Sequence, residues 1–256
     1  MKIATFNANS VRVRAEILLD WLAENQPDVL AIQETKCEDD KFPQEIFQES
    51  GYNVVFHGQK SYNGVAIASR APAQRVTTGF GDVSWPEDCR ILAAEIDGVL
   101  ILNTYVPNGN KVGSEKFQYK LDWLARLRRW MDDRMDSGQD CIWLGDINIA
   151  RHPEDVYDSA KVLGGVGHHP QEFEALDRVL DWGWSDCFRK FTTEGGHFTF
   201  WEFVIPRAVE RDIGWRIDHI YASPSLAQRC SGCWIDKAPR LLERPSDHTF
   251  VIAEFA

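Results

Sequence analysis

The sequence of 256 residues has no apolar run long enough to cross a membrane, and its first residues, Met1 to Asn9, lack the apolar run of a signal peptide. Internal repeats, low-complexity tracts and long Pro/Gly/Ser-rich linkers are absent as well. These absences argue against a membrane protein and against two domains separated by a linker. We therefore expect a single domain over residues 1–256 in a cytoplasmic protein.

Positive charge is scarce, because 28 Lys and Arg residues stand against 39 Asp and Glu residues, a formal net charge of −11. This disfavours nucleic-acid binding through bulk positive charge, which works by neutralising phosphates. An acidic total is still compatible with a local basic face, or with carboxylates gathered around a metal. The basic residues in loops or near polar motifs that could contact phosphates are Arg12, Arg14, Lys36, Lys60, Arg70, Arg207 and Arg211.

The six cysteines are scattered along the chain and do not form the framework of a small disulfide-stapled protein. We expect reduced, mostly buried thiols. Cys230 and Cys233 form one Cys-x-x-Cys motif, but no second pair stands at zinc-finger spacing. A structural zinc or redox role for this pair is the alternative.

Short apolar or alternating runs bounded by Gly, Asn, Asp or Pro predict strands. These runs cover residues 3–6, 29–32, 52–56, 65–68, 91–96, 99–104, 141–144, 217–222 and 250–255. The clearest helix is predicted over residues 114–135, with Lys, Arg and Asp outside its apolar stripe, and further helical stripes cover 15–24, 44–49 and 171–182. Many strands with few helices predict an α/β fold in which two sheets pack face to face with helices outside.

Polar side chains recur where the predicted strands end. Any one of them is ordinary turn chemistry, but their recurrence at the ends of different strands predicts a functional site on a rigid scaffold. The set comprises Asn7, Glu34, Tyr105, Asn108, Asp146, Asn148, Asp218, Asp247 and His248.

The oxygen donors in this set suit Mg²⁺ or Mn²⁺ better than zinc, because no His or Cys cluster at ligand spacing accompanies them. The candidate ligands are Glu34, Asp247 and the Asn7 amide. Such a cation commonly partners a phosphate, so Asp146 and His248 become candidates for positioning water and contacting the phosphate. Asp218 could hold the imidazole in one orientation, although a His beside an Asp can also be purely structural.

At these residues the sequence resembles the exonuclease III and abasic-endonuclease family of the larger endonuclease/exonuclease/phosphatase fold. The blocks that carry the resemblance are Thr5–Asn9, Ile32–Lys36, Asn103–Gly109, Leu144–Asn148, Gly214–Asp218 and Ser246–His248. The resemblance implies a four-layer αββα sandwich, with two central mixed β-sheets flanked by helices and a metal-dependent phosphodiesterase site where strand ends of the two sheets meet.

The resemblance also implies a role for each polar residue. Glu34 would bind the metal with help from Asn7 and Asp247. Asp146, supported by Asn148, would orient or deprotonate the attacking water. His248, paired with Asp218, would contact the scissile phosphate, and Tyr105 and Asn108 would contact the phosphate or assist the leaving oxygen. The reaction implied is an in-line displacement at phosphorus without a covalent enzyme intermediate.

A further block, Phe198–Trp201 with Gly214–Ile217, is similar to the one that lines the abasic-sugar pocket in the DNA-repair branch. Carried over, Phe200, Trp215 and Ile217 would form an apolar slot for a flipped-out sugar without a base, and the alternative is that they belong to the core. The sequence departs from the family pattern at residues 161–173 and after Trp201. His168 and His169 could line the groove there, and solvated loop histidines are the alternative.

The function implied is a Mg²⁺-dependent DNA-repair phosphodiesterase that cleaves the backbone 5′ to abasic sites and has 3′–5′ exonuclease and 3′-end-trimming activity. Its partner would be double-stranded DNA with abasic sites or damaged 3′ ends, bound by a monomer associated with the nucleoid. The alternatives are a phosphodiesterase of the same fold acting on a non-DNA phosphate ester, and a nonenzymatic DNA-binding relative.

Overall fold

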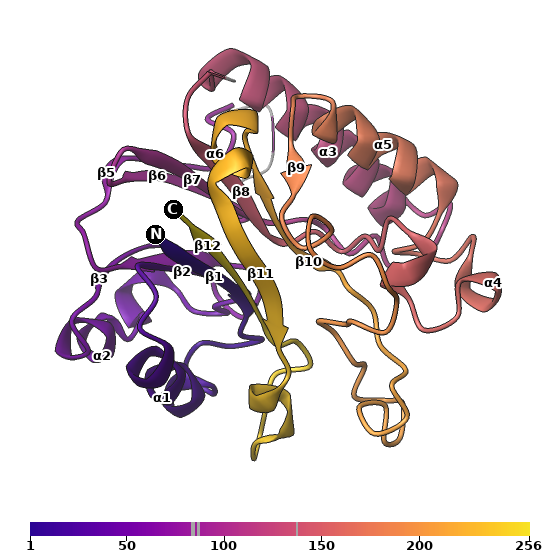
Figure 1. Ribbon diagram of the computed structural model, residues 1–256, viewed down its shortest axis with the longest axis horizontal. Coiled ribbons are helices and arrows are strands. Elements are labelled where there is room, and N and C mark those ends of the chain that lie inside the picture. Colours follow the sequence, from indigo (N-terminus) through magenta and orange to yellow (C-terminus); the bar gives the residue numbers. More distant parts are fainter. Residues whose placement is uncertain (83–84, 86–87, 137) are drawn as a thin grey trace.

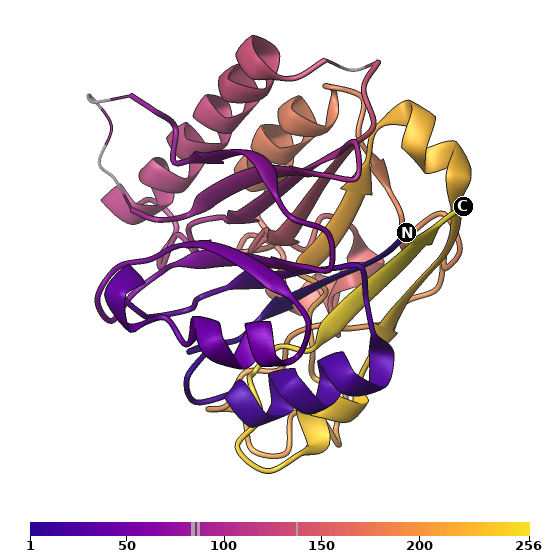
Figure 2. The same ribbon diagram turned by 90° about the vertical axis from the view of Figure 1, so that its left-hand side faces the viewer.

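The computed structural model describes residues 1–82, 85, 88–136 and 138–256. Its strands form two six-stranded sheets, with the orders β11-β12-β1-β2-β4-β3 and β5-β6-β7-β8-β10-β9. The two sheets are stacked, and helices cover their outer faces (Figures 1 and 2). This four-layer α/β sandwich confirms the predicted fold class.

The strands of the first sheet are β1 (Lys2–Asn7), β2 (Val29–Gln33), β3 (Asn53–His57), β4 (Val65–Ser69), β11 (Cys230–Asp236) and β12 (Phe250–Phe255). The strands of the second are β5 (Gln74–Thr78), β6 (Ile91–Ile96), β7 (Val99–Tyr105), β8 (Cys141–Asp146), β9 (Ser185–Asp186) and β10 (Asp218–Ala222).

The helices are α1 (Ala15–Asn25), α2 (Gln44–Glu49), α3 (Glu115–Arg134), α4 (Ser159–Val162), α5 (Pro170–Leu180) and α6 (Pro224–Arg229). Short 3₁₀ turns cover η1 (Asp39–Lys41), η2 (Pro153–Asp155) and η3 (Ala238–Leu241). None of the helices in the described part of the chain is both long and apolar enough to span a membrane.

Three apolar clusters hold the layers together. One lies between the sheets and includes Ile3, Ile101 and Ile142. The second packs α1 and α2 against the first sheet through side chains such as Trp21 and Phe47. The third packs α3 and α5 against the second sheet, through a larger set that includes Trp123, Leu127, Leu176 and Trp143. The strands therefore read as nearly continuous apolar runs, because helices or the other sheet cover their faces.

Each sheet contains one parallel strand pair, β1 with β2 and β7 with β8. The helix between the two strands is α1 in one sheet and α3 in the other, as a parallel connection requires. Asn7 and Gln33 pair at the carboxyl ends of the first two strands, and Tyr105 and Asp146 pair at those of the second two. The sheets thus bring polar strand ends from both halves of the chain to one edge of the sandwich.

The predicted strands all exist, most with ends shifted by one or two residues. Three strands were missed. β5 is a mostly exposed edge strand with a polar sequence, β9 has only two residues, and β11 carries a bulge between Cys230 and Gly232. The Ser114 hydroxyl caps α3, and this helix ends at Arg134 with Met135 as its C-cap, so the predicted range 114–135 is confirmed to within one residue at each end.

The cysteine prediction is confirmed, because all six thiols are free and buried. Cys230 and Cys233 lie in the apolar cluster between the sheets together with Cys187. Among the described residues, the close group of potential metal ligands contains no cysteine. The Cys-x-x-Cys motif is therefore part of the core in this structure.

Candidate functional site

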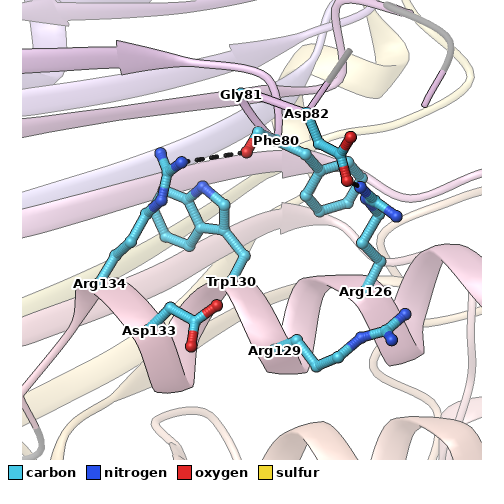
Figure 3. A pocket seen from close by; sticks show the side chains of 8 residues that line it. All are labelled: Phe80, Gly81, Asp82, Arg126, Arg129, Trp130, Asp133 and Arg134. Atoms are coloured by element: carbon cyan, nitrogen blue, oxygen red, sulfur yellow. Dashed lines mark hydrogen bonds and ion pairs between the residues drawn. The ribbon is translucent and has the colours of Figure 1, made fainter. Parts of the chain in front are cut away.

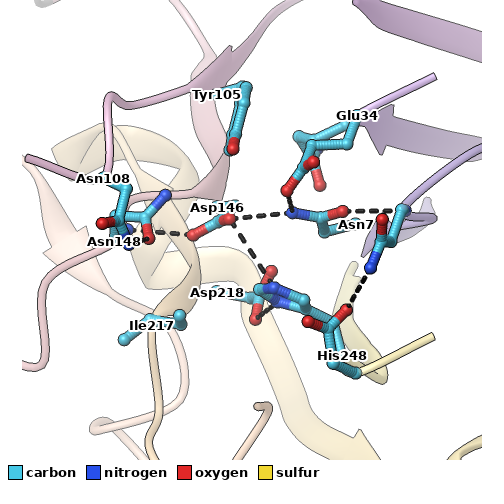
Figure 4. A network of polar contacts seen from close by, with 12 residues as sticks. Asn7, Glu34, Tyr105, Asn108, Asp146, Asn148, Ile217, Asp218 and His248 are labelled. Carbon is cyan, nitrogen blue, oxygen red and sulfur yellow. Dashed lines mark hydrogen bonds and ion pairs between the residues drawn. The ribbon is translucent and has the colours of Figure 1, made fainter. Parts of the chain in front are cut away.

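The Asn7 side chain links the two sheets at the site. Its amide nitrogen donates to Glu34 Oε1 at 2.9 Å and to Asp146 Oδ2 at 2.8 Å, while its oxygen accepts the backbone N–H of Asn9 at 2.9 Å. One buried amide thus holds a carboxylate from each half of the fold (Figure 4). The sequence analysis did not assign to Asn7 this role as a donor to Glu34, a candidate metal ligand, and to Asp146, the candidate base for the attacking water.

Asp146, His248 and Asp218 form a line of buried titratable groups. His248 Nδ1 lies 2.8 Å from Asp218 Oδ2, and His248 Nε2 lies 3.8 Å from Asp146 Oδ2. Asp218 starts β10 directly opposite Asp146 at the end of β8, and His248 precedes β12 in the other sheet. The imidazole is therefore oriented by one carboxylate and faces another (Figure 4).

Asn148 and Asn108 support Asp146 from the side of the second sheet. The Asn148 backbone N–H donates to Asp146 Oδ1 at 2.9 Å, and its side-chain amide donates to the Val106 carbonyl at 2.9 Å. Asn108 Nδ2 donates to Asn148 Oδ1 at 3.1 Å. These contacts fix the Asp146 carboxylate. Tyr105 lies at the end of the neighbouring strand, β7 (Figure 4).

Asp247 reaches the same site through a chain of polar contacts. Its Oδ1 accepts from Asn9 Nδ2 at 2.9 Å, and Asn9 Oδ1 accepts from Lys36 Nζ at 2.6 Å. Lys36 Nζ also lies 2.8 Å from Glu34 Oε2. Neither Asn9 nor the pairing of Lys36 with Glu34 was singled out from the sequence, although both residues belong to blocks that carry the resemblance.

The loops that carry these groups are backbone-strained. Five non-glycine residues here have φ between 45° and 95°, a region that L-residues rarely adopt: Asn9, Ser10, Glu34, Lys36 and Asn148. Such conformations persist only where the surrounding structure enforces them, and they are enriched at functional sites. The strain therefore marks the same place as the polar contacts do.

Burial and neighbouring charges shift the titration of the site. Burial raises the pKa of Asp146 to about 7; the Asp218 and Glu34 carboxylates act in the same direction, against the opposing effect of His248. Burial alone would lower the pKa of His248, but Asp218 and Asp146 outweigh it and raise this pKa to about 10. Burial and the Glu34 and Asp146 carboxylates also raise the pKa of Tyr105, which keeps its hydroxyl protonated.

The donor set fits a hard divalent cation. One potential ligand atom each from Glu34, Asp146 and His248 lies within 4.8 Å of the others. Asp218 Oδ1 is buried without a hydrogen-bond partner, so the cluster holds more negative charge than its contacts neutralise. The carboxylate oxygens are ligands that Mg²⁺ or Mn²⁺ prefers, whereas His248, whose pKa is raised to about 10, carries a proton on both ring nitrogens and is not a metal ligand in that state.

The three predicted slot residues lie together. Ile217 is buried in a small cluster with Ala150 and Val156, and the half-buried Phe200 and Trp215 pack against it. The Phe200 ring also lies 4.9 Å from the His248 ring, which places the cluster beside the acidic groups.

The prediction of solvated loop histidines is wrong for His168. This side chain is buried, with Nδ1 at 2.7 Å from the Ala150 carbonyl and Nε2 at 2.8 Å from the Ser159 hydroxyl. Its ring packs edge-on against Trp215, so it forms part of the wall behind the apolar cluster. His169 instead accepts from the Gln171 backbone and begins α5.

A buried polar bridge behind the site was also missed. Gln33 Nε2 donates to Asn103 Oδ1 at 2.7 Å and to the Thr5 hydroxyl at 2.9 Å. Asn103 Nδ2 donates to the backbone carbonyls of Ile32 and Ala66, so the amide pair joins both sheets. The amides at these positions within otherwise apolar strands were the available signal.

Of the basic residues expected near phosphates, Arg70 is misplaced. It follows β4, which runs antiparallel to β2, so it lies at the opposite edge of the sheet and stacks on Tyr52. Arg14 does approach the site, where it donates to the Asn9 and Pro245 carbonyls.

Another hollow, of about 310 Å³, lies over α3, away from the acidic groups (Figure 3). Two of its arginines are already engaged. Arg126 pairs with Asp82, and Arg134 donates to the Phe80 carbonyl at 3.2 Å while stacking on Trp130. We therefore place the functional site at the strand ends and not in this hollow.

The fold and the site together define a hydrolase. The model of the Endonuclease/Exonuclease/phosphatase family matches residues 4–248, and the chain belongs to this family, within its exonuclease III and AP endonuclease branch. Exodeoxyribonuclease III of Haemophilus influenzae is 32% identical over the whole of both chains.

Two solved structures are similar over 100% of this chain and 99% of their own. An AP endonuclease from Archaeoglobus fulgidus has a TM-score of 0.96 and 43% identity. The 3′ phosphatase NExo from Neisseria, bound to a product DNA hairpin, has a TM-score of 0.96 and 38% identity.

Proposed function

We propose that the protein is a Mg²⁺-dependent DNA-repair phosphodiesterase that cleaves 5′ to abasic sites and trims 3′ ends, acting as a monomer with a single domain. The observation that carries this proposal is the contact of Asp146 with both the Asn7 amide and the His248–Asp218 pair. A carboxylate base, an oriented imidazole and a second carboxylate then surround one point, as phosphodiester hydrolysis requires.

Asp146 is the group that takes the proton of the attacking water. A pKa near 7 leaves a large ionised fraction at neutral pH, while keeping the carboxylate basic enough to accept a proton. The Asn148 N–H and the Asn7 amide hold its two oxygens in place. Asp146 therefore loses little entropy when it aligns the water.

His248 and Tyr105 act on the phosphate as donors. Because Asp218 accepts from Nδ1 and stabilises the imidazolium, His248 presents Nε2–H to a phosphate oxygen. The protonated Tyr105 hydroxyl and the Asn108 amide face the same space from the second sheet and would contact the phosphate or the leaving oxygen.

Glu34 is the main carboxylate for the cation, with Asp247 on the other side of Asn9 and Asn7 as the donor that orients Glu34. When bound, Mg²⁺ or Mn²⁺ would neutralise charge that develops on the phosphate. Lys36 forms an ion pair with Glu34. The apolar cluster of Phe200, Trp215 and Ile217 lies beside His248 and would accommodate a sugar without a base.

The test is a single gel with three DNA substrates: an abasic duplex, a recessed 3′ end and a 3′-phosphate end. Each is incubated with Mg²⁺ and, in parallel, with EDTA, and inositol phosphates serve as the non-DNA ester. We expect Mg²⁺-dependent products from the DNA substrates and none with EDTA. Phosphate released from the inositol esters alone would support the non-DNA alternative, and no turnover of any ester would support the nonenzymatic one.

A further inference from the structure

Lys120 is a fully buried lysine on α3, at a position where the helix otherwise buries apolar side chains. Its ammonium group donates to the Asn108 carbonyl at 3.2 Å, to the Asn148 carbonyl at 2.8 Å and to Glu172 Oε1. An ammonium group has three N–H donors, so each of them has an acceptor. All three hydrogen-bond donors of the Lys120 ammonium group are therefore satisfied by its surroundings.

Two of the three acceptors belong to loops that form the site, and the third, Glu172 in α5, holds a further loop through Gly167. Asn108 follows β7, and Asn148 follows β8. Glu172 Oε2 accepts the Gly167 N–H at 2.7 Å, and the Gly167 carbonyl accepts the Ala150 N–H at 2.8 Å. A single buried ion pair thus ties three loops together from below the site.

We propose that Lys120 and Glu172 are positioning residues for the reaction at Asp146, an inference that rests on the proposed function. By fixing the backbone carbonyls of Asn108 and Asn148, the ammonium group fixes the two amide side chains as well. The Asn148 N–H then holds Asp146 Oδ1, so the ion pair acts on the base through one residue.

The energetics of buried ion pairs favour this role over a purely structural one. Desolvation cancels most of the attraction, and apolar replacements of similar volume are often as stable or more stable. What an apolar pair cannot supply is a donor to the two loop carbonyls. The planar fork of an arginine would not match three acceptors around one nitrogen either.

The experiment compares Lys120→Met with the double variant Lys120→Met/Glu172→Leu. We expect Lys120→Met to lose stability and to lower kcat by about 10- to 100-fold with a smaller change in KM, because Asp146 and the Asn108 and Asn148 amides shift while the contacts of the apolar cluster with the substrate remain. The double variant should regain stability, since no buried charge is left unpaired, but should keep the low kcat.

The matched control is Leu127→Ala, which removes a buried side chain two turns further along the same helix. It should lower the stability by a cavity effect and leave kcat near the wild-type value. The proposal is overturned if the double variant regains wild-type kcat, or if Leu127→Ala at equal stability loses as much activity as Lys120→Met.

A second measurement distinguishes failure of this proposal from failure of the proposed function. If the wild type cleaves none of the DNA substrates, the proposed function fails, and positioning is then read from the side-chain amide NMR signal of Asn148. We expect this signal to shift and lose exchange protection in the double variant and to persist in Leu127→Ala. An unchanged signal in the double variant would refute the positioning role.

Discussion

The protein contains two buried clusters of charged side chains, and they differ in how well their charges are balanced. The acidic site contains Asp146, Asp218 and Glu34, and Asp218 keeps one buried oxygen without a partner. The second, which we call the balanced cluster, consists of Asp155, Asp186, Arg189 and Arg216. Arg216 and Asp218, two residues apart, belong to different clusters.

In the balanced cluster each charge has its counterpart. Arg216 Nε donates to Asp155 Oδ1 at 2.7 Å, and Nη2 donates to Asp186 Oδ2 at 2.8 Å. Arg189 also pairs with Asp155. Burial opposes ionisation of Asp155, yet Arg216 outweighs it and lowers the pKa of Asp155 to about 2. At Asp146 burial acts with neighbouring carboxylates and the pKa rises.

The pKa of Asp155 is lowered and that of Asp146 is raised, and this difference indicates that the balanced cluster stabilises the fold whereas the acidic site is suited to chemistry. Paired carboxylates with lowered pKa values stabilise the fold at neutral pH. Carboxylates held together without enough positive charge cost stability, and perturbed pKa values of this kind concentrate at functional sites. Strained loops also surround the acidic site, so backbone strain and incompletely balanced charge occur together where the protein is predicted to act.

The largest expected effect comes from Asp146→Asn. Because asparagine cannot accept the proton of water, cleavage of the abasic duplex should fall by about 10²- to 10⁴-fold. The free energy of unfolding should stay the same or rise, since one poorly compensated buried charge is removed. Steady-state cleavage assays and urea unfolding in EDTA measure the two quantities.

His248→Ala serves as the companion variant and should lose activity to a similar degree while remaining folded. Its stability should fall relative to Asp146→Asn, because Asp218 then loses its imidazole partner. Wild-type activity in both variants would refute the assignment of the site.

The next effect is on stability and comes from Arg216→Met. Removing the guanidinium leaves Asp155 and Asp186 short of positive charge, so unfolding should become easier by about 3 to 5 kcal/mol. Urea unfolding at neutral pH measures this loss. The matched control is Arg229→Met, whose partner Asp140 lies at the surface, and its effect should stay below about 1 kcal/mol. Equal losses in both variants would contradict the distinction between buried and exposed pairs.

The acidic site was more accessible to prediction from sequence than the balanced cluster was. Asn7, Glu34 and Asp146 end apolar runs, and the recurrence of polar residues at strand ends, together with the family resemblance, pointed to them. Parallel pairing in the structure explains why such ends meet at one edge. The balanced cluster joins Asp155 to Arg216, which are 61 residues apart, and no local pattern records that contact. Lys120 was not singled out from the sequence, because the charged residues of this helix were placed outside its apolar stripe and are usually exposed.

The strand predictions succeeded and failed for the same physical reason. Buried strands such as β4 and β6 keep an apolar signal, since both of their faces are covered. The edge strand β5 has little to bury, and the bulge in β11 hides its alternation behind Ser231 and Gly232. The burial of His168 needed coordinates, because its contacts come from loops.

The smallest expected effect is on how the free energy of unfolding changes with pH below about pH 5. Asp155 has a folded-state pKa of about 2, below the ordinary value, so its contribution is complete above about pH 5 and is lost as the pH falls toward 2. Arg216 lowers the pKa of Asp186 as well, so both depressions disappear in Arg216→Met, and the stability gap between wild type and variant should narrow by at least about 2 kcal/mol between pH 6 and pH 2.5. Urea unfolding at both pH values measures it, with Arg229→Met as the variant whose gap should stay constant. A gap that stays constant for Arg216→Met as well would mean that Asp155 keeps its low pKa without Arg216, and that Arg189 alone balances it.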